Sequence, residues 1–237
     1  MIGNFWVLPR ASLSSAAEAQ VSFVKILRIL LEIHSNFVQQ TPQTRHFYRG
    51  AALAEVVVRR WHIIDKIKIM KVILYMAITA NGFIAKKNDD TSWISRDEWD
   101  SYSQMVQRAR CMVVGHRTYN ILTKQPEFSE LKDVRLVAVS KKDFQVLAAN
   151  HTVAHSPKEA LEALKDFPEV VVAGGGQLNA AFLEENLVDE IYLDIEPIVF
   201  GEGIPIFRDK GFERKLELLD QKKITAQEIQ LHYRVIK

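Results

Sequence analysis

The chain has 237 residues, 48% of them hydrophobic and 25% charged, with a formal net charge of +2, which is ordinary for a globular protein with one sizeable domain and an extension. The single cysteine, Cys111, excludes an intrachain disulfide framework and a zinc site built from cysteines, and the most apolar stretch, 21–33, contains too many charges for a membrane-spanning helix. Residues 70–237 contain 22 Lys and Arg against 25 Asp and Glu, so the main body lacks the basic surface of a nucleic-acid-binding protein. We therefore expect a cytoplasmic protein with no nucleic-acid or membrane partner.

Residues 1–69 differ from the rest of the chain. They contain nine Lys and Arg against four Asp and Glu, and they show one helical pattern, over about 14–34, without regular strand and turn signals. Three interpretations are open: a targeting peptide, a helical appendage, or a translation start at Met70. We favour the last, because Met70 opens the first strand of what reads as a complete domain. The predicted organisation is an extension over 1–69 and a domain over 70–237.

From Met70 onward, short apolar stretches alternate with helical patterns. The patterns predict strands at 70–77, 111–115, 134–139, 152–154, 170–173, 189–196, 214–223 and 227–236. They predict helices at 96–109, 117–122, 158–166 and 177–185. This alternation favours a three-layer α/β/α fold, with a mostly parallel eight-stranded sheet and a C-terminal antiparallel hairpin. The edge formed by 224–236 is a candidate surface for a homodimer.

The most informative stretch joins the strand at 170–173 to the next helix through Gly174, Gly175 and Gly176. Three glycines remove every Cβ from the turn, so backbone N–H groups can approach an anion whose charge the helix dipole favours. The spacing matches neither the GxGxxG of a Rossmann fold nor a Walker loop. A tight turn without a ligand would use the same residues. The stretch indicates a phosphate-binding loop for a nucleotide cofactor, with the plain turn as the alternative.

Five motifs follow one another in the domain: YMAITANGFIA (75–85), WIS (93–95), MVVGHRTY (112–119), LVDEI (187–191) and PIVFGEG (197–203). Their order resembles the dihydrofolate reductase fold. More narrowly, it resembles the reductase domain of the riboflavin-biosynthesis deaminase-reductase and its stand-alone relatives. The resemblance covers residues 70–237 and implies an NADPH-dependent reductase.

The resemblance implies a set of residues around the cofactor. The glycine turn and the start of its helix would line the pyrophosphate: Gly174, Gly175, Gly176, Gln177 and Leu178. A second turn would hold the phosphates from the other side: Gly115, His116, Arg117 and Thr118. Relatives usually carry arginine at the position of His116, so the preference for NADPH over NADH is open. Ser140 and Lys141 would meet the adenosine phosphate, and Asn81 replaces an aspartate beside the nicotinamide.

Hydride transfer also needs a proton, and the resemblance points to a carboxylate at the start of the helix at 96–109. Counting from Trp93, that position is Glu98, with Asp97 beside it as a substrate contact. A structural alternative is open, because Ser95 and Glu98 also match a capping box.

Further substrate contacts are aromatic or buried. Trp93, Trp99 and Tyr102 are candidates for a ring pocket, although aromatic residues at helical spacing are common in cores. Asp194 interrupts a strand that should be central, so its carboxylate needs either a partner or a ligand. Both interpretations of Asp194 are open.

The resemblance implies reduction of a pyrimidine or pterin-like heterocycle. The leading activity is reduction of 5-amino-6-(5-phosphoribosylamino)uracil, although the sequence has no clear second phosphate cluster for this substrate. Dihydrofolate reduction is one alternative, and a non-catalytic nucleotide-binding relative is another, because Asn81 and His116 both depart from the pattern. No metal site is expected, since His151 and His155 lie near a strand without an evident third ligand.

Overall fold

The computed structural model describes residues 70–208 and 211–237, so the predicted extension and its helix over 14–34 lie outside the described residues. The main sheet contains β1 (Lys71–Thr79), β3 (Cys111–Gly115), β4 (Arg135–Val139), β5 (His151–Ala154), β6 (Glu169–Val172), β7 (Glu190–Glu196), β9 (Leu216–Lys223) and β10 (Ile229–Val235). The helices are α3 (Arg96–Ala109), α4 (His116–Leu122), α5 (Pro157–Glu162) and α6 (Gly176–Glu184), with a 3₁₀ helix, η1 (Pro126–Leu131). Two short strands, β2 (Phe83–Ala85) and β8 (Ile204–Pro205), form a separate pair.

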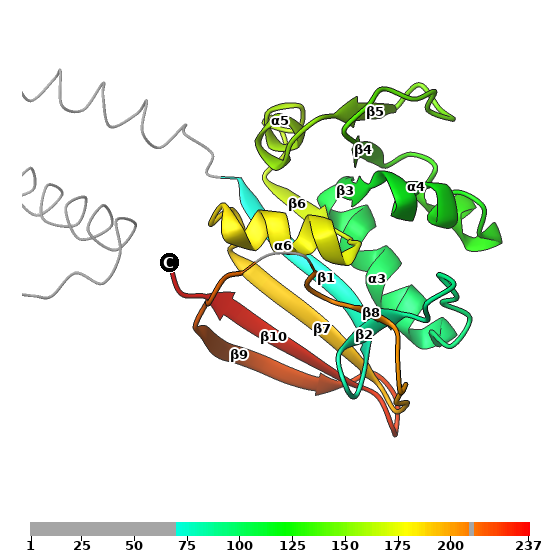
Figure 1. Ribbon diagram of the computed structural model, residues 1–237, viewed down its shortest axis with the longest axis vertical. Helices are drawn as coiled ribbons and strands as arrows, with labels where there is room; N and C mark the ends of the chain where they lie inside the picture. Colours follow the sequence, from blue (N-terminus) through cyan, green and yellow to red (C-terminus); the bar gives the residue numbers. More distant parts are fainter. Residues whose placement is uncertain (1–69, 209–210) are drawn as a thin grey trace, which may run out of the picture. The chain divides into compact units, whose positions relative to one another are not determined.

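The strands of the main sheet follow the order β5-β4-β3-β6-β1-β7-β10-β9 (Figure 1). All pairs from β5 to β7 are parallel, and β10 runs antiparallel to both β7 and β9. The chain leaves β1 for β3 on one side and later returns past β1 to β7. Ligands of open α/β sheets bind where the strand order reverses in this way, outside the carboxyl ends of the strands. The predicted eight-stranded, mostly parallel sheet with its closing hairpin is confirmed.

Helices cover both faces of the parallel part, because its strands are apolar on both sides. On one face the strands pack against α5 and α6 through Ala160 and Phe182, both fully buried. On the other face they pack against α3 and α4 through Val106 and Tyr119. The domain therefore has three layers, with a core on each side of the sheet.

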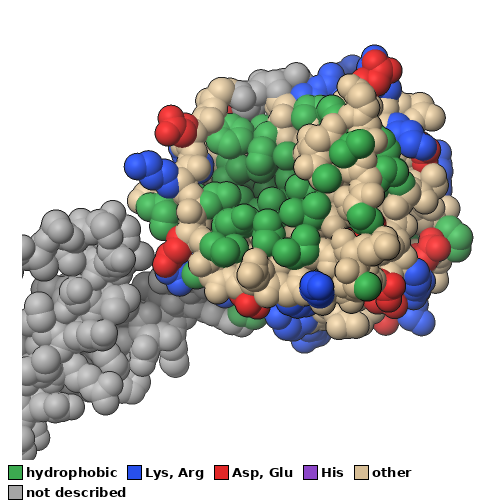
Figure 2. All heavy atoms as spheres, turned by 90° about the horizontal axis from the view of Figure 1, so that it is seen from below, with side chains coloured by type: hydrophobic (Ala, Val, Ile, Leu, Met, Phe, Trp, Pro, Cys, Tyr) green, Lys and Arg blue, Asp and Glu red, His purple; other side chains and the backbone are tan. Residues whose placement is uncertain are grey.

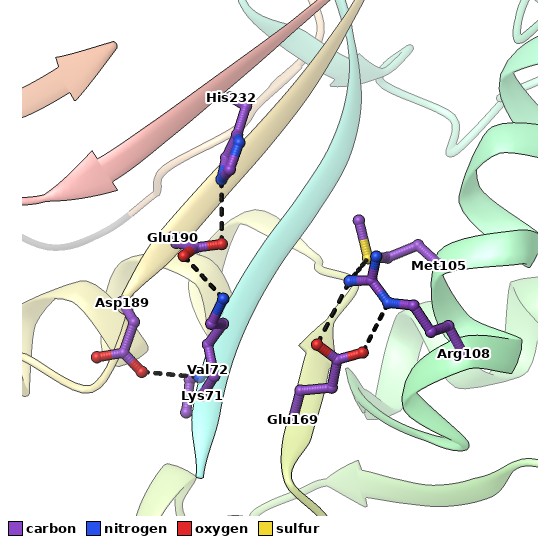
Figure 3. A network of polar contacts seen from close by, with 8 residues as sticks. All are labelled: Lys71, Val72, Met105, Arg108, Glu169, Asp189, Glu190 and His232. Carbon is purple, nitrogen blue, oxygen red and sulfur yellow. Dashed lines mark hydrogen bonds and ion pairs between the residues drawn. The ribbon is translucent and has the colours of Figure 1, made fainter. Parts of the chain in front are cut away.

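Ion pairs hold together the amino ends of the parallel strands (Figure 3). Glu190 on β7 lies 3.0 Å from Lys71 Nζ on β1 and 3.0 Å from His232 Nε2 on β10. Burial acts to raise the pKa of Glu190, but hydrogen bonds from Lys71 and His232 lower it overall. Arg108 of α3 donates to Glu169 of β6 at 2.8 Å. The side chains at the amino ends of the strands therefore pair with one another, whereas the carboxyl ends border the cavity described below.

The sequence patterns missed the smallest elements and the end of one helix. The strands β2 and β8 have three and two residues, too few for a periodic pattern, and pair only because two loops meet. The helix η1 was not expected either. The helix expected at 158–166 ends at Glu162, because the hydrogen bonds after it tighten to the i−3 type, such as Phe167 N–H to the Leu164 carbonyl, and form turns before Pro168.

Apolar surface is exposed on the side where Figure 1 places β9 and β10. Seen from there, hydrophobic side chains gather in a hollow bordered by charged ones (Figure 2). Leu216 and Leu218 of the edge strand β9 are 42% and 52% exposed. Such surface is typical of protein–protein contacts, and the homodimer stays a prediction. Among the described residues, no helix is long and apolar enough to cross a membrane.

Candidate active site

A cavity of about 1340 Å³ opens at the carboxyl ends of the parallel strands. Its wall contains Gly115 at the end of β3, Ser140 after β4, His155 after β5 and Gly175 after β6. Across from them, the first turn of α3 contributes Glu98. The volume exceeds the roughly 300–1,000 Å³ of a pocket for one drug-sized ligand, so the cavity has room for two ligands side by side.

One side of the cavity, which we call the glycine end, is lined by Gly115, Gly175, Gly176 and the start of α6, with Gly174 next to this wall. Gly174 has φ +83°, a backbone conformation that favours glycine, and its carbonyl accepts a 2.7 Å hydrogen bond from Gly115 N–H. A Cβ added at Gly176 would lie 2.4 Å from the carbonyl oxygen of Pro205. The absence of side chains thus lets β3, β6 and the β8 segment approach one another.

The glycine end has the features of an anion site. Gly175 occupies the N-cap position of α6 and has no side chain that could accept the helix's first N–H groups, and the first turn contains no acidic residue. Thr118 Oγ1 lies 3.2 Å from the position of a Cβ on Gly175. Lys141 lines the same cavity, as does His155, whose hydrogen bond to the Ser140 carbonyl raises its pKa. Backbone donors and cations here fit the phosphate groups of a dinucleotide.

His116 and Arg117 differ in how they meet the cavity. The His116 ring stacks on Phe144, with centroids 4.0 Å apart. Arg117 Nη2 lies 2.6 Å from Asp89 Oδ2, so its charge is already paired. Arg117 lies in the turn expected to hold the cofactor phosphates, and its guanidinium is paired with Asp89.

The opposite side, the α3 end, is built from α3, η1, the end of α4 and the β2–α3 loop, and it includes the Arg117 side chain that pairs with Asp89 of this loop. Ser95 is the N-cap of α3, and its Oγ accepts a 3.0 Å hydrogen bond from Glu98 N–H. The second half of the expected capping box does not form, because Ser95 N–H donates instead to Glu196 Oε1 at 2.8 Å. The Glu98 carboxyl is therefore not used as a cap and lines the cavity, 4% exposed.

The surroundings of Glu98 favour its protonated form. Burial is the main cause that raises its pKa well above the usual range, and the nearby carboxylates Asp194, Glu196 and Glu228 raise it further. No hydrogen bond contributes to this shift. A buried carboxyl whose pKa is raised in this way is suited to donate a proton to a ligand.

Asp194 has partners inside the protein. It is 1% exposed, accepts a hydrogen bond from the Tyr75 hydroxyl, and accepts another from Gln230 Nε2 at 2.7 Å. Burial raises its pKa to about 6, although these two hydrogen bonds act against the rise. The structure places Asp194 behind the cavity wall. Its charge contributes to the raised pKa of Glu98, but Asp194 itself does not line the cavity.

The cavity brings together most of the predicted site residues: Glu98, Trp99, Tyr102, Gly115, His116, Arg117, Thr118, Ser140, Lys141, Gly175, Gly176, Gln177 and Leu178. The predicted residues outside its wall are Asn81, Trp93, Asp97, Gly174 and Asp194.

The outlying residues have structural reasons for their positions. Asn81 Nδ2 donates to the Phe200 carbonyl at 2.6 Å and so ties two loops together. Trp93 packs edge-on against Phe200 and donates to the Asp90 carbonyl. Asp97 is exposed in the first turn of α3, where a negative charge complements the helix dipole.

Lys142 also lines the wall and continues the predicted segment of Ser140 and Lys141. Several other wall residues were not predicted. His155 follows the carboxyl end of β5, and its position after a strand is the signal that could have identified it. Asp89 and Glu127 lie in loops, and only tertiary folding brings them to the cavity. Within the described ranges, no group of three or more His, Cys, Asp and Glu side chains is placed to hold a metal ion.

Comparison with known proteins agrees with this geometry. The chain is 28% identical over 169 residues to the uncharacterized protein YwjB of Bacillus subtilis (strain 168), covering 69% of this chain and 97% of that protein. A pyrimidine reductase-like protein from Corynebacterium diphtheriae has a similar structure, with a TM-score of 0.58 and 16% identity over 72% of this chain and 94% of that one.

A diaminohydroxyphosphoribosylaminopyrimidine deaminase/5-amino-6-(5-phosphoribosylamino)uracil reductase from Thermotoga maritima is also similar in structure. Its TM-score is 0.55 at 18% identity, over 70% of this chain and 56% of that one. These two structural likenesses establish the fold. The family model of the RibD C-terminal domain matches residues 70–230. The chain therefore belongs to the RibD C-terminal domain family.

Proposed function

We propose that this protein is a reductase that uses NADPH to reduce a planar pyrimidine or pterin-like heterocycle. The observation that carries the proposal is a single cavity that joins a glycine loop at a helix N-terminus to a buried carboxyl group, Glu98. Reduction by hydride transfer needs these two parts: a place that holds the nicotinamide cofactor and a source of the accompanying proton.

The glycine end would bind the cofactor phosphates. Backbone N–H groups at the start of α6, the Thr118 hydroxyl and the Lys141 ammonium are the donors in reach of this part of the cavity. Lys142 adds positive charge beside Ser140, and the raised pKa of His155 favours its protonated form there, which supports NADPH, with its extra phosphate, over NADH. When bound, the cofactor supplies the hydride.

The α3 end would bind the substrate ring. Trp99 lines the cavity there, and its indole N–H donates to Glu130 Oε2 at 3.0 Å, which fixes the orientation of the ring. Together with Ile94 and Tyr102 it forms an apolar wall that excludes water. Glu98 holds a proton on its carboxyl oxygen and would deliver it to a nitrogen or oxygen of the substrate.

Two substrates have specific support. The phosphoribosylaminouracil is supported by the family and by the activity named for the Thermotoga maritima relative. Dihydrofolate is supported by the buried acid at the start of α3. The same cavity without turnover would make the protein a nucleotide-binding relative.

The test follows NADPH binding and oxidation separately in the full chain. Binding is titrated by the change in NADPH fluorescence, and turnover is followed by NADPH absorbance with each substrate in turn. Turnover of either substrate supports a reductase. Binding of NADPH without turnover of any heterocycle would leave only the nucleotide-binding function, and absence of NADPH binding would overturn the proposal.

A further inference from the structure

We propose that the heterocycle reduced at this site carries no phosphate group. The inference rests on the proposed reductase function and narrows its substrate class. It comes from the ionisable residues that line the α3 end: Asp89, Asp90, Arg96, Glu98, Arg117 and Glu127.

Both arginines at this end are already paired. Arg96 Nη2 lies 2.9 Å from Glu130 Oε1 and 2.9 Å from Asp100 Oδ1. Arg117 binds Asp89 through two of its nitrogens, Nε at 2.8 Å and Nη2 at 2.6 Å. A substrate phosphate that approached either guanidinium would also meet the carboxylate that already neutralises its charge.

The remaining charges at the α3 end are negative or neutralised. Asp90 pairs with Lys86 at 2.7 Å. Glu127 lines the cavity, and among the described residues no ion pair involves it. Glu98 is buried there, with the carboxylates of Asp194, Glu196 and Glu228 behind it. A phosphate placed here would face the carboxylate of Glu127 and, behind the protonated Glu98, the carboxylates of β7 and of the turn before β10, and this repulsion disfavours a phosphorylated ligand.

The N-terminus of α3, at this end of the cavity, is already capped and carries acidic side chains. The Ser95 hydroxyl caps Glu98 N–H, and Asp97 and Glu98 place acidic side chains in the first turn of α3. The other cations of the cavity belong to the opposite side. Lys141 and Lys142 follow β4, and Arg208 lies against Gly176, with its Cβ 3.3 Å from the position of a Cβ on that glycine.

These features suit an uncharged ring. A protonated Glu98 carboxyl can both donate and accept hydrogen bonds with the nitrogen and carbonyl edge of a pyrimidine or pterin. Trp99, Tyr102 and Ile94 provide apolar surface for the ring faces. The substrate class is therefore a phosphate-free pyrimidine or pterin, with at most a short hydroxylated side chain.

The test uses matched pairs that differ only in a phosphate: 5-amino-6-ribosylaminouracil and its 5′-phosphate, and a trihydroxypropyl-7,8-dihydropterin and its monophosphate. With NADPH and the full chain, kcat/KM should be on the order of tenfold higher for the phosphate-free member of a pair. Added salt should raise kcat/KM for the phosphorylated member only, because screening weakens the repulsion.

A charge variant provides a second measurement. Glu127→Lys should reduce the preference for the phosphate-free compound more than the neutral control Glu127→Gln does. Equal use of both members, or preference for the phosphorylated one, overturns the inference and leaves the reductase function intact. If neither member is turned over, equilibrium binding of each pair to the NADPH-loaded protein decides the preference. Binding of neither would overturn the proposed function as well.

Discussion

The two ends of the cavity are built from different material. At the glycine end the protein supplies backbone N–H groups and the space left by missing side chains, with Gly176 packed against the Pro205 carbonyl. At the α3 end it supplies a buried side chain, Glu98, whose pKa is raised mainly by burial and further by carboxylates from β7 and from the turn before β10. One half of the site therefore depends on local backbone geometry, and the other on burial and on charges that are distant in the sequence.

The largest effect is expected for Glu98→Gln, which keeps the shape of the α3 end and removes the acid. We expect kcat to fall about 10²- to 10⁴-fold with no change in the Kd for NADPH, because the glycine end is untouched. In the unsubstituted protein, the raised pKa of Glu98 predicts that kcat declines only as the pH rises above the usual range of a glutamate. Steady-state rates across pH 5–9 measure both.

The control for this variant is Asp100→Asn, on the same helix and outside the cavity wall. It should keep kcat within about twofold, since Arg96 stays paired with Glu130. A weaker NADPH complex in Glu98→Gln would mean that the two ends are not independent.

The opposite pattern, in which NADPH binding is the property that changes, is expected for Gly176→Ala. The added methyl group would collide with the Pro205 carbonyl, so the β8 segment and the start of α6 must move apart. Overpacking of this kind costs about 1–3 kcal/mol, and we expect NADPH binding to weaken about 10- to 100-fold. Fluorescence titration measures the Kd. Gly201→Ala is the matched control, because a Cβ there meets nothing within 4 Å; equal losses in both variants would contradict the prediction.

The charges behind Glu98 can be tested through stability. Burial raises the folded-state pKa of Asp194 from 3.8 to about 6, so the stability it contributes is present below about pH 4 and is lost as the pH rises through 6. This amounts to about 3 kcal/mol. Asp194→Asn should remove that part of the decline in the free energy of unfolding, whereas Asp220→Asn, on the exposed strand β9, should keep it. Urea unfolding at pH 4–8 measures how the free energy of unfolding changes with pH. The same pH dependence in Asp194→Asn as in the unsubstituted protein would argue against a protonated Asp194.

The smallest effect is expected for Lys141→Ala. Its ammonium is exposed, so water and salt screen its contact with a cofactor phosphate. We expect the Kd for NADPH to rise about three- to tenfold and the Kd for NADH to stay unchanged. Titration with both cofactors gives the ratio. A parallel loss of both affinities would place Lys141 away from the extra phosphate of NADPH.

The pattern of the sequence predicted the larger elements well, because each carries its own periodic or capping signal. The strand at 111–115 has the predicted bounds, and α6 begins at Gly176, one residue from its predicted start. The glycine turns also carry a local signal, because adjacent glycines between a strand and a helix allow backbone conformations and close approaches that other residues do not. The cavity wall at Gly115, Gly175 and Gly176 was accordingly anticipated.

The side-chain pairings at the α3 end could not be predicted from local sequence patterns in the same way. The capping-box pattern at Ser95 and Glu98 was present in the sequence, but Glu196 of β7 takes the Ser95 N–H and leaves the Glu98 carboxyl facing the cavity. Asp194 was recognised as a buried charge, but its partner Gln230 lies 36 residues away on β10. Such pairings depend on strand order, which no local pattern encodes.

The sequence by itself thus determined the α/β architecture, the family resemblance and the glycine loop, since these follow from local periodicity and from backbone conformations that glycine adopts easily. Only the tertiary structure decided which carboxyl faces the cavity and which arginines are already paired. Those outcomes depend on contacts such as Arg117 with Asp89 and Arg96 with Glu130, between residues 28 and 34 positions apart. A charge acts through space, so its role is fixed by the neighbours that folding brings to it.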